Sequence, residues 1–222
     1  MWASDGGQVI VLVEGFLPNG LGLPVAQREH AERRSVRVRS GGSDAFVAIT
    51  FAAYNAGRCH NLDEENLCRI YERRPLVCRI YPMEINPHIP LTPAAKDCPP
   101  ESWEIGPQLI VGGKLVDQEL AGLIERSRQA DREEIAIKDR ICVALGIRTT
   151  ALKGDGFTAY LPDMAAFAAA IDQVRLQPTA QETGEWQFHL SGDDIAREVM
   201  AGGARVVTEA TPDYAFISLR AA

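Results

Sequence analysis

Three segments near the start of the chain carry the hydrophobic patterns of β-strands. Residues 8–16, QVIVLVEGF, are apolar and rich in β-branched side chains, which is typical of a buried strand. Residues 34–40 alternate strictly, with Val36 and Val38 on one face and arginines on the other, as in a half-exposed strand. Residues 45–51 follow a GGS turn. The second and third segments are therefore predicted to form a β-hairpin.

Residues 52–107 break with this regular pattern because they are dense in proline. Proline cannot donate to a ladder of backbone hydrogen bonds, so long helices and strands are not expected here. We predict a largely irregular segment with one short helix around residues 69–73 and no long strand. An irregular stretch of this length needs something other than backbone pairing to hold it, and a metal ion would do so. The prolines stand at 75, 82, 87, 90, 93, 99, 100 and 107.

Residues 114–146 have apolar side chains at helical spacing, and Gly146 is placed to end the helix. Gly122 is a candidate interruption that would divide this stretch into two helices. Residues 162–174 read as a further helix with Asp163 as its N-cap.

The end of the chain carries one more helix signal and two strand signals. Ser191 with Asp194 three residues on is close to a capping box at the start of a helix. Residues 204–210 and 214–219 have the composition of strands, and we expect them to form a closing strand pair.

Together these patterns predict an α+β fold: a small sheet, an irregular cysteine-rich segment, a long helical hairpin and a C-terminal α/β piece. The expected domains are a cysteine-cluster domain over residues 1–148 and a small α+β subdomain over 149–222. No internal repeat is visible.

Composition and charge narrow the class of protein. A hydrophobic fraction of 46% and a charged fraction of 24% are ordinary for a globular protein. The net charge of −7 argues against nucleic acid as a partner, although residues 28–39 contain five arginines. Those arginines are interleaved with Glu29 and Glu32, which favours a charged strand face. The first residues lack the basic region of a signal peptide, and no apolar run approaches the roughly 20 residues of a membrane span. We expect no membrane association and a reducing, cytoplasmic setting.

Four of the five cysteines fall between residues 59 and 98, spaced C-x8-C-x9-C-x19-C. A metal site, a redox pair, disulfides and dispersed buried thiols are the candidate explanations. In a reducing compartment, clustered cysteines favour metal or redox chemistry over disulfides. The spacing lacks the C-x2-C pair of common structural zinc sites, so spacing alone does not decide. Cys142 lies in the helical stretch, where core packing is expected.

The surroundings of these cysteines are basic. Four thiolates on one divalent ion leave a net charge of about −2, which nearby cations would offset. Arginines could do so, or they could form a solvated face paired with local glutamates; both interpretations are compatible. His60 and His88 flank the segment and could each replace a thiolate, although a surface role is the commoner one for a single histidine. The arginines are Arg69, Arg73, Arg74 and Arg79, and the glutamates Glu64, Glu65 and Glu72.

Residues 59–82, CHNLDEENLCRIYERRPLVCRIYP, resemble the second half of the cysteine cluster in the YkgJ-type family of zinc- or iron-chelating domains. The shared pattern is a cysteine, a short acidic loop and then C-x-I-Y-x-x-R-P-x-x-C-R-x-[YF]-P. "DCPP" around Cys98 resembles a later cysteine of the family. The resemblance implies a metal site at Cys59, Cys68, Cys78 and Cys98, holding zinc, iron or an iron–sulfur cluster. A more distant similarity runs to flagellin lysine N-methylases, which share such a segment.

The chain departs from this family at one point. The family has an N-terminal C-x-x-C-x-x-C-C cluster, whereas no cysteine here precedes Cys59. Either the sequence starts downstream of that cluster or part of the site has been lost. If the remaining site is complete, at least three of its sulfurs should lie within about 4 Å of one another, as tetrahedral zinc requires.

Three classes of function stay open at this point. The first is a zinc- or iron-binding protein whose site is structural or serves metal handling. The second is an iron–sulfur enzyme for redox, methyl or other group transfer that uses the same cysteines. The third is an arginine-mediated binding module with inert cysteines. No phosphate loop, nucleophile elbow or zinc-protease helix is present in the sequence, so whether the chain is an enzyme stays open.

Overall fold

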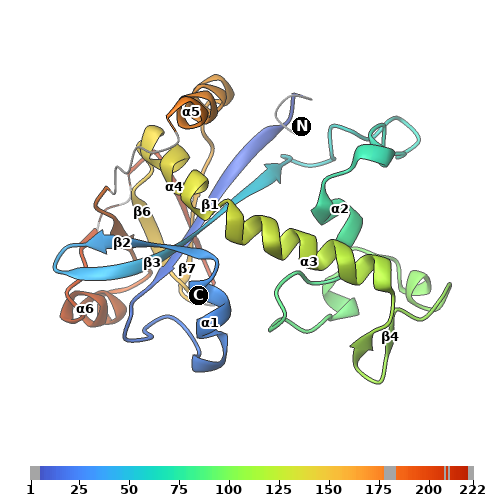
Figure 1. The fold of residues 1–222 in the computed structure, drawn as a ribbon, viewed down its shortest axis with the longest axis horizontal. Helices are drawn as coiled ribbons and strands as arrows, with labels where there is room; N and C mark the ends of the chain where they lie inside the picture. The colour runs from blue at the N-terminus through green and yellow to red at the C-terminus, as the bar shows by residue number, and fades with distance from the viewer. Residues whose placement is uncertain (1–5, 178–183, 208, 210, 220–222) are drawn as a thin grey trace. The chain divides into compact units, whose positions relative to one another are not determined.

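The computed structural model describes residues 6–177, 184–207, 209 and 211–219 (Figure 1). The chain forms two compact units: Met1–His60 with Glu134–Ala222, here called the sheet unit, and Asn61–Glu133, here called the insert. The predicted α+β class is confirmed, since a mixed sheet and separate helices make up the structure. The bounds of the two units do not coincide with a boundary at residue 148.

The sheet unit is built around β1 (Gln8–Phe16), as Figure 1 shows. This strand pairs antiparallel with β3 (Ser43–Tyr54) from Gln8 to Phe16. Its other edge pairs with β6 (Thr149–Leu152) in parallel and with β7 (Gly156–Tyr160) in antiparallel. Strands from both ends of the sequence therefore share one sheet, which is why residue 148 does not separate compact units.

The remaining strands extend this sheet at its margins. β2 (Ser35–Ser40) pairs with β3, and β10 (Ala215–Ser218) pairs with β7. β8 (Gln187–His189) runs parallel to β6, and β9 (Val206–Val207) runs parallel to β8. The sheet is thus larger than the small one expected from the sequence.

The predicted hairpin of β2 and β3 is confirmed. Val38 is buried, whereas Arg37 and Arg39 are exposed and both donate hydrogen bonds to Asp44 across the hairpin. The hydrogen bond from Arg37, followed by that from Arg39, lowers the pKa of Asp44 below its ordinary value. These two arginines form the charged strand face that the sequence indicated.

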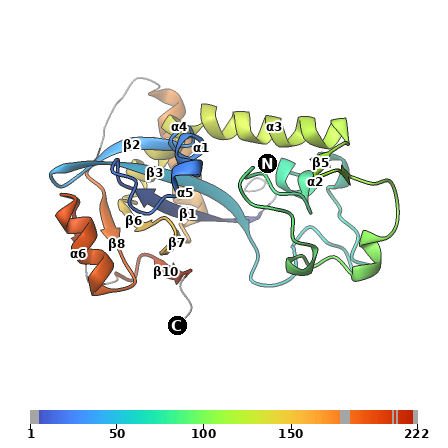
Figure 2. The ribbon, with the colours of Figure 1, turned by 90° about the horizontal axis from the view of Figure 1, so that it is seen from below.

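Four helices and a short 3-10 turn accompany the sheet in the described part of this unit. Asp163 caps α5 as predicted, because its carboxylate accepts the N–H of Ala166 at 2.9 Å. α4 packs against α5 and against β3, and α6 lies beside β8 in Figure 2. The core between these elements includes Phe167 and Val174 of α5. The elements are η2 (Val25–Gln27), α1 (Arg28–Glu32), α4 (Ile135–Ala144), α5 (Met164–Leu176) and α6 (Asp193–Ala201).

Two expectations for the end of the chain are wrong. Ser191 does not cap α6, because its hydroxyl and N–H both donate to the buried carboxylate of Asp155. The predicted closing strands do not pair with each other either, since β9 and β10 lie at opposite ends of the sheet order. β9 pairs with β8, whereas β10 pairs with β7. Local composition does not specify these partners. Residues 208 and 210 of the predicted strand 204–210 lie outside the described residues.

The insert is largely irregular, as the proline pattern predicted. No strand occurs among its described residues 75–100, and helical turns alternate with loops there. A tight turn at Gly112 and Gly113, both with positive φ, joins its two short strands. Its apolar cluster includes Ile80, Leu123 and Ile124, where α2 packs against α3. The elements are η3 (Tyr71–Arg73), α2 (Leu76–Ile80), η4 (Pro93–Ala95), η5 (Pro100–Trp103), β4 (Ile110–Val111), β5 (Lys114–Leu115) and α3 (Gln118–Glu133).

The long helical stretch divides at Glu134 and not at Gly122. Gly122 lies inside α3, whereas Glu134 separates α3 from α4. Gly146 ends α4 as predicted, with φ of +74°. The N–H groups of Gly146 and Ile147 donate to the carbonyls of Val143 and Cys142, the pair of bonds that defines a Schellman motif.

These two glycines give a matched prediction. A Cβ added at either position meets no atom within 4 Å, so the substitutions differ only in backbone conformation. We expect Gly122→Ala to raise the free energy of unfolding by about 1 kcal/mol, because alanine favours a helix interior. Gly146→Ala should lower it by about 1 kcal/mol, because its φ is left-handed. Urea unfolding of both variants checks the signs, and equal effects would contradict the assignment.

A buried acid lies within the core of the sheet unit. Asp139 of α4 is 6% exposed, and its Oδ1 has no well-formed hydrogen bond among the described residues. Burial raises the pKa of Asp139 above 3.8, and Arg148 and the indole of Trp186 offset only part of this effect. Cys142, one turn further along α4, is fully buried, and the same burial raises the pKa of its thiol.

The raised pKa of Asp139 makes the stability of the fold depend on pH. The contribution of this carboxyl is most favourable when it is protonated, and it is lost as the pH rises through the folded pKa. Asp139→Asn should therefore stabilise the protein relative to wild type at about pH 7, and the gain should shrink toward about pH 4. Thermal melts across this range measure the difference. The exposed Asp172→Asn serves as control, and a gain from Asp139→Asn that did not vary with pH would refute the linkage.

Candidate metal centre

The four clustered cysteines belong to both units of the structure. Cys59 follows β3 in the sheet unit, whereas Cys68, Cys78 and Cys98 lie in the insert. All five cysteines fall within the described residues, and none forms a disulfide. The thiols of the cluster are half-buried or exposed, in contrast to Cys142.

A short turn places Cys68 opposite Leu62, with which it forms an isolated antiparallel bridge. The turn is organised by Asp63, whose carboxylate accepts the N–H groups of Glu65 and Leu67 at 3.1 and 2.7 Å. Asn66 adopts a positive φ of 65°, which asparagine tolerates better than most residues. The acidic loop of the sequence motif therefore builds the turn that precedes Cys68.

Cys78 lies in the middle of α2 and is exposed. The helix starts directly after Pro75, whose carbonyl accepts the N–H groups of Cys78 and Arg79. Ile80 of the same helix is 1% exposed and contributes to the apolar cluster of the insert. Burial of Ile80 thus fixes the helix, while the thiol of Cys78 stays accessible to solvent.

Tyr81 connects the end of α2 to the segment that carries Cys98. Its hydroxyl accepts the N–H of Asp97 at 3.0 Å. A hydrogen bond with Cys98, followed by burial, raises the pKa of Tyr81 above 10.0. The neighbouring Lys96 forms an ion pair with Glu84, and its ammonium lies 5.8 Å from the centre of the Tyr81 ring. In the sequence, Tyr81 stands out only by its place before Pro82 in the motif.

The described residues do not group these donors into a formed site. Among them, no set of three or more His, Cys, Asp or Glu side chains is arranged to hold a metal ion. His60 and His88 are exposed and belong to no such set. The thiols are suitable donors for zinc or iron, and the ligand set of Cys59, Cys68, Cys78 and Cys98 stays a prediction.

Three arginines near the cysteines make contacts that the structure defines, and none of these contacts is with sulfur. Arg69 donates to the carbonyl of Leu62 at 3.3 Å. Arg74 lies over the ring of Tyr71, 3.7 Å from its centre, and donates to the carbonyl of the same residue. Arg79 pairs with Glu119 of α3 and not with the local glutamates that the sequence suggested. These contacts give the arginines a role in holding the loops of the insert.

Comparison with known proteins bears on the same segment. The sequence model of the family CxxCxxCC, described as "Putative zinc- or iron-chelating domain", matches residues 23–99. The match contains Cys59, Cys68, Cys78 and Cys98 and ends one residue after the last of them. It spans parts of both units, from before the β2–β3 hairpin to η4 and Cys98. No curated protein and no solved structure matches the chain.

The contact of Tyr81 with the Cys98 segment gives a prediction for the metal-free protein. In Tyr81→Phe the acceptor for the N–H of Asp97 is lost while the ring is kept, so the segment should loosen. We expect Cys98 to react with iodoacetamide about threefold faster, the effect of one exposed hydrogen bond worth somewhat under 1 kcal/mol. Mass spectrometry of digested protein measures the rate for each cysteine.

Tyr71→Phe is the matched control, because it removes a hydroxyl from the same segment away from Cys98. Cys142 provides an internal reference, since it is fully buried. An unchanged rate at Cys98 in Tyr81→Phe would show that the hydroxyl does not hold this loop.

Proposed function

We propose that this protein binds zinc or iron through the thiolates of Cys59, Cys68, Cys78 and Cys98. The observation that carries the proposal is the match over residues 23–99 to the family described as "Putative zinc- or iron-chelating domain", because this match contains all four cysteines. The match supports metal binding in general terms. The identity of the ligands and assignment to the YkgJ-type branch are our proposal.

The local structure supports this choice of ligands. Cys68, Cys78 and Cys98 lie on short elements that are held by few buried side chains, so modest loop movements can change the distances between their sulfurs. Their thiols are accessible, which a ligand that binds metal from solution requires. Metal binding and ordering of such loops are coupled, because the ligands gain their geometry only together with the ion.

The role of the bound metal follows from the elements that carry its ligands. These are a turn, a one-and-a-half-turn helix and a loop of the insert, together with the segment after β3. A bound zinc ion would cross-link these segments and stabilise them, which is a structural or metal-handling role. An iron–sulfur cluster on the same thiolates would instead supply redox or group-transfer chemistry.

A cytoplasmic location is part of the same proposal. Accessible cysteines without disulfides persist in a reducing compartment. In the part of the chain that the structure describes, no helix combines the length and the apolar character needed to cross a bilayer.

Substitution of single cysteines tests the proposal. Cys68→Ser and Cys78→Ser should lose most of the bound metal and melt at a lower temperature, because each removes one thiolate from a shared ion. Cys142→Ala should keep its metal and lose about 1 kcal/mol of stability from packing. Metal content per chain and thermal melting are measured for all variants after purification with and without oxygen.

Each outcome of this experiment decides one part of the proposal. Equal metal content in the three variants, or a wild-type protein that holds no metal under any condition, would refute the proposal. Loss of metal in Cys142→Ala alone would refute the ligand assignment. A brown protein that absorbs near ~400 nm when purified without oxygen identifies an iron–sulfur cluster, and a colourless zinc-loaded protein identifies the structural role.

A further inference from the structure

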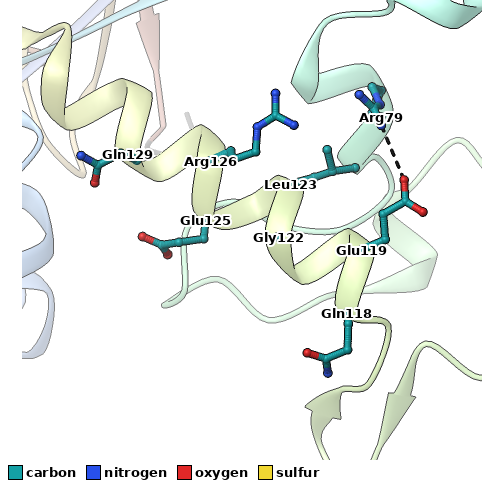
Figure 3. A pocket seen from close by; sticks show the side chains of 8 residues that line it. All are labelled: Arg79, Gln118, Glu119, Gly122, Leu123, Glu125, Arg126 and Gln129. Carbon is teal, nitrogen blue, oxygen red and sulfur yellow. Dashed lines mark ion pairs between the residues drawn. The ribbon is translucent and has the colours of Figure 1, made fainter.

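A groove of about 590 Å³ runs along α3 within the insert (Figure 3). The residues that line it come from α3 and from Arg79 of α2. Figure 3 shows the side chains of Leu123 and Arg126 on the side of α3 that faces α2, whereas Gln118 and Glu125 point away from it. This side of the groove therefore carries two arginines and an apolar side chain, together with Glu119, which points to Arg79.

The groove is open because a glycine lies at its centre. A Cβ at Gly122 would meet no atom within 4 Å, so the space beside this helix position is not filled by the protein. Leu123 next to it is 7% exposed and belongs to the apolar cluster of the insert. A ligand in the groove would contact the edge of this cluster.

Two arginines and two glutamates line the groove, but only Arg79 and Glu119 pair with each other. Glu125 is engaged by Arg132 at 2.7 Å, on the far side from Arg79. Arg126 is exposed and forms no hydrogen bond or ion pair with any described residue. Arg79 has Glu119 as its partner at 3.6 Å, but the side chain of Glu119 is 83% exposed. Such exposed pairs contribute little to stability, so Glu119 is easily displaced.

We propose that this groove binds a small molecule that carries an oxyanion on an apolar body. Guanidinium groups present planar sets of N–H donors that match the oxygens of carboxylates and phosphates. Arg79 and Arg126 approach the groove from two different helices, so one oxyanion can take donors from both. That oxyanion replaces the carboxylate of Glu119 as the partner of Arg79. The apolar body then lies over Gly122 and Leu123.

This site is distinct from the proposed metal centre. Its residues include none of the cysteines, and the guanidinium groups of Arg79 and Arg126 bind anions and not metal ions. Arg79 directly follows Cys78 in the sequence, so both sites share α2. The groove can therefore be tested in the metal-free protein, and its failure would leave the metal proposal untouched.

Phenyl phosphate is a suitable probe, because it joins an oxyanion to an apolar ring. Binding to the full-length protein is followed by NMR, through the shifts of the backbone amides of α3. We expect saturable binding in the millimolar range, with shifts centred on Gly122 and Arg126. Benzoate carries a carboxylate on the same ring and should also bind, whereas phenol lacks the charge and should not. Inorganic phosphate should bind more weakly than phenyl phosphate, because it makes no contact with Leu123.

Three variants should weaken binding of phenyl phosphate. Arg126→Gln and Arg79→Gln should each reduce affinity about fivefold, the effect of one charge-assisted hydrogen bond at an exposed position. Gly122→Leu should abolish binding by filling the groove, and the open space at this position lets the variant fold. Arg175→Gln removes an exposed arginine on α5 of the sheet unit and should bind like wild type.

The proposal is overturned by any of three results. The first is the absence of saturable shifts in α3 up to about 20 mM probe. The second is equal affinity of wild type, Arg126→Gln and Gly122→Leu. The third is equal binding of phenol or of inorganic phosphate and phenyl phosphate, which would remove the role of the charge or of the apolar contact.

Discussion

The pairing of β1 on both of its edges is the constraint on which the sheet unit depends. One edge forms an antiparallel ladder with β3 over the whole length of β1, and the other edge pairs with β6 and β7. Val11 and Val13 in this strand are fully buried because strands cover both edges and the core covers one face. Since β3 precedes and β6 follows the insert in sequence, this ladder brings together segments that are far apart in the chain. The chain can leave the sheet after Tyr54 and return at α4 without interrupting it.

The insert is held by weaker means. Its helices are short apart from α3, and the apolar cluster of Ile80, Leu123 and Ile124 is small beside the core of the sheet unit. Small cores provide little stability, and protein units of this size commonly gain the rest from metals or disulfides. Single polar contacts, such as that of Asp63 with its turn and that of Tyr81 with Asp97, then determine where the cysteines lie. The physical weakness of this unit and its cysteine content are consistent with each other.

The arginines of the insert show how one residue type meets different needs at neighbouring positions. Arg69 satisfies a backbone carbonyl, Arg74 covers an aromatic ring, and Arg79 reaches across to α3. Each contact connects one part of the insert to another. The arginines of the motif therefore have structural partners and do not serve only to offset the charge of the thiolates. The groove along α3 arises from the same arrangement, because α2 brings Arg79 close to a helix face that lacks a side chain at Gly122.

Much of the local structure follows from the sequence alone. Alternation of valine and arginine predicted the β2–β3 hairpin, and the density of proline predicted the irregular insert. Asp163 predicted the start of α5, and Gly146 predicted the end of α4. These features depend on neighbours within a few residues, which the sequence displays directly. The motif also sets the four cysteines apart, and their role as metal ligands stays a prediction. The sequence also suggested a closing strand pair and a serine cap that the fold does not have.

Those failures share one physical cause. Which strand lies beside β1, and whether Ser191 caps a helix or binds Asp155, depend on contacts between residues that are far apart in the chain. The same holds for the partner of Arg79 and for the contact of Tyr81 with the Cys98 segment. Local patterns specify which elements form because propensity and capping act over one or two turns. Only the tertiary structure decides what those elements pack against, because burial and pairing are properties of the whole chain.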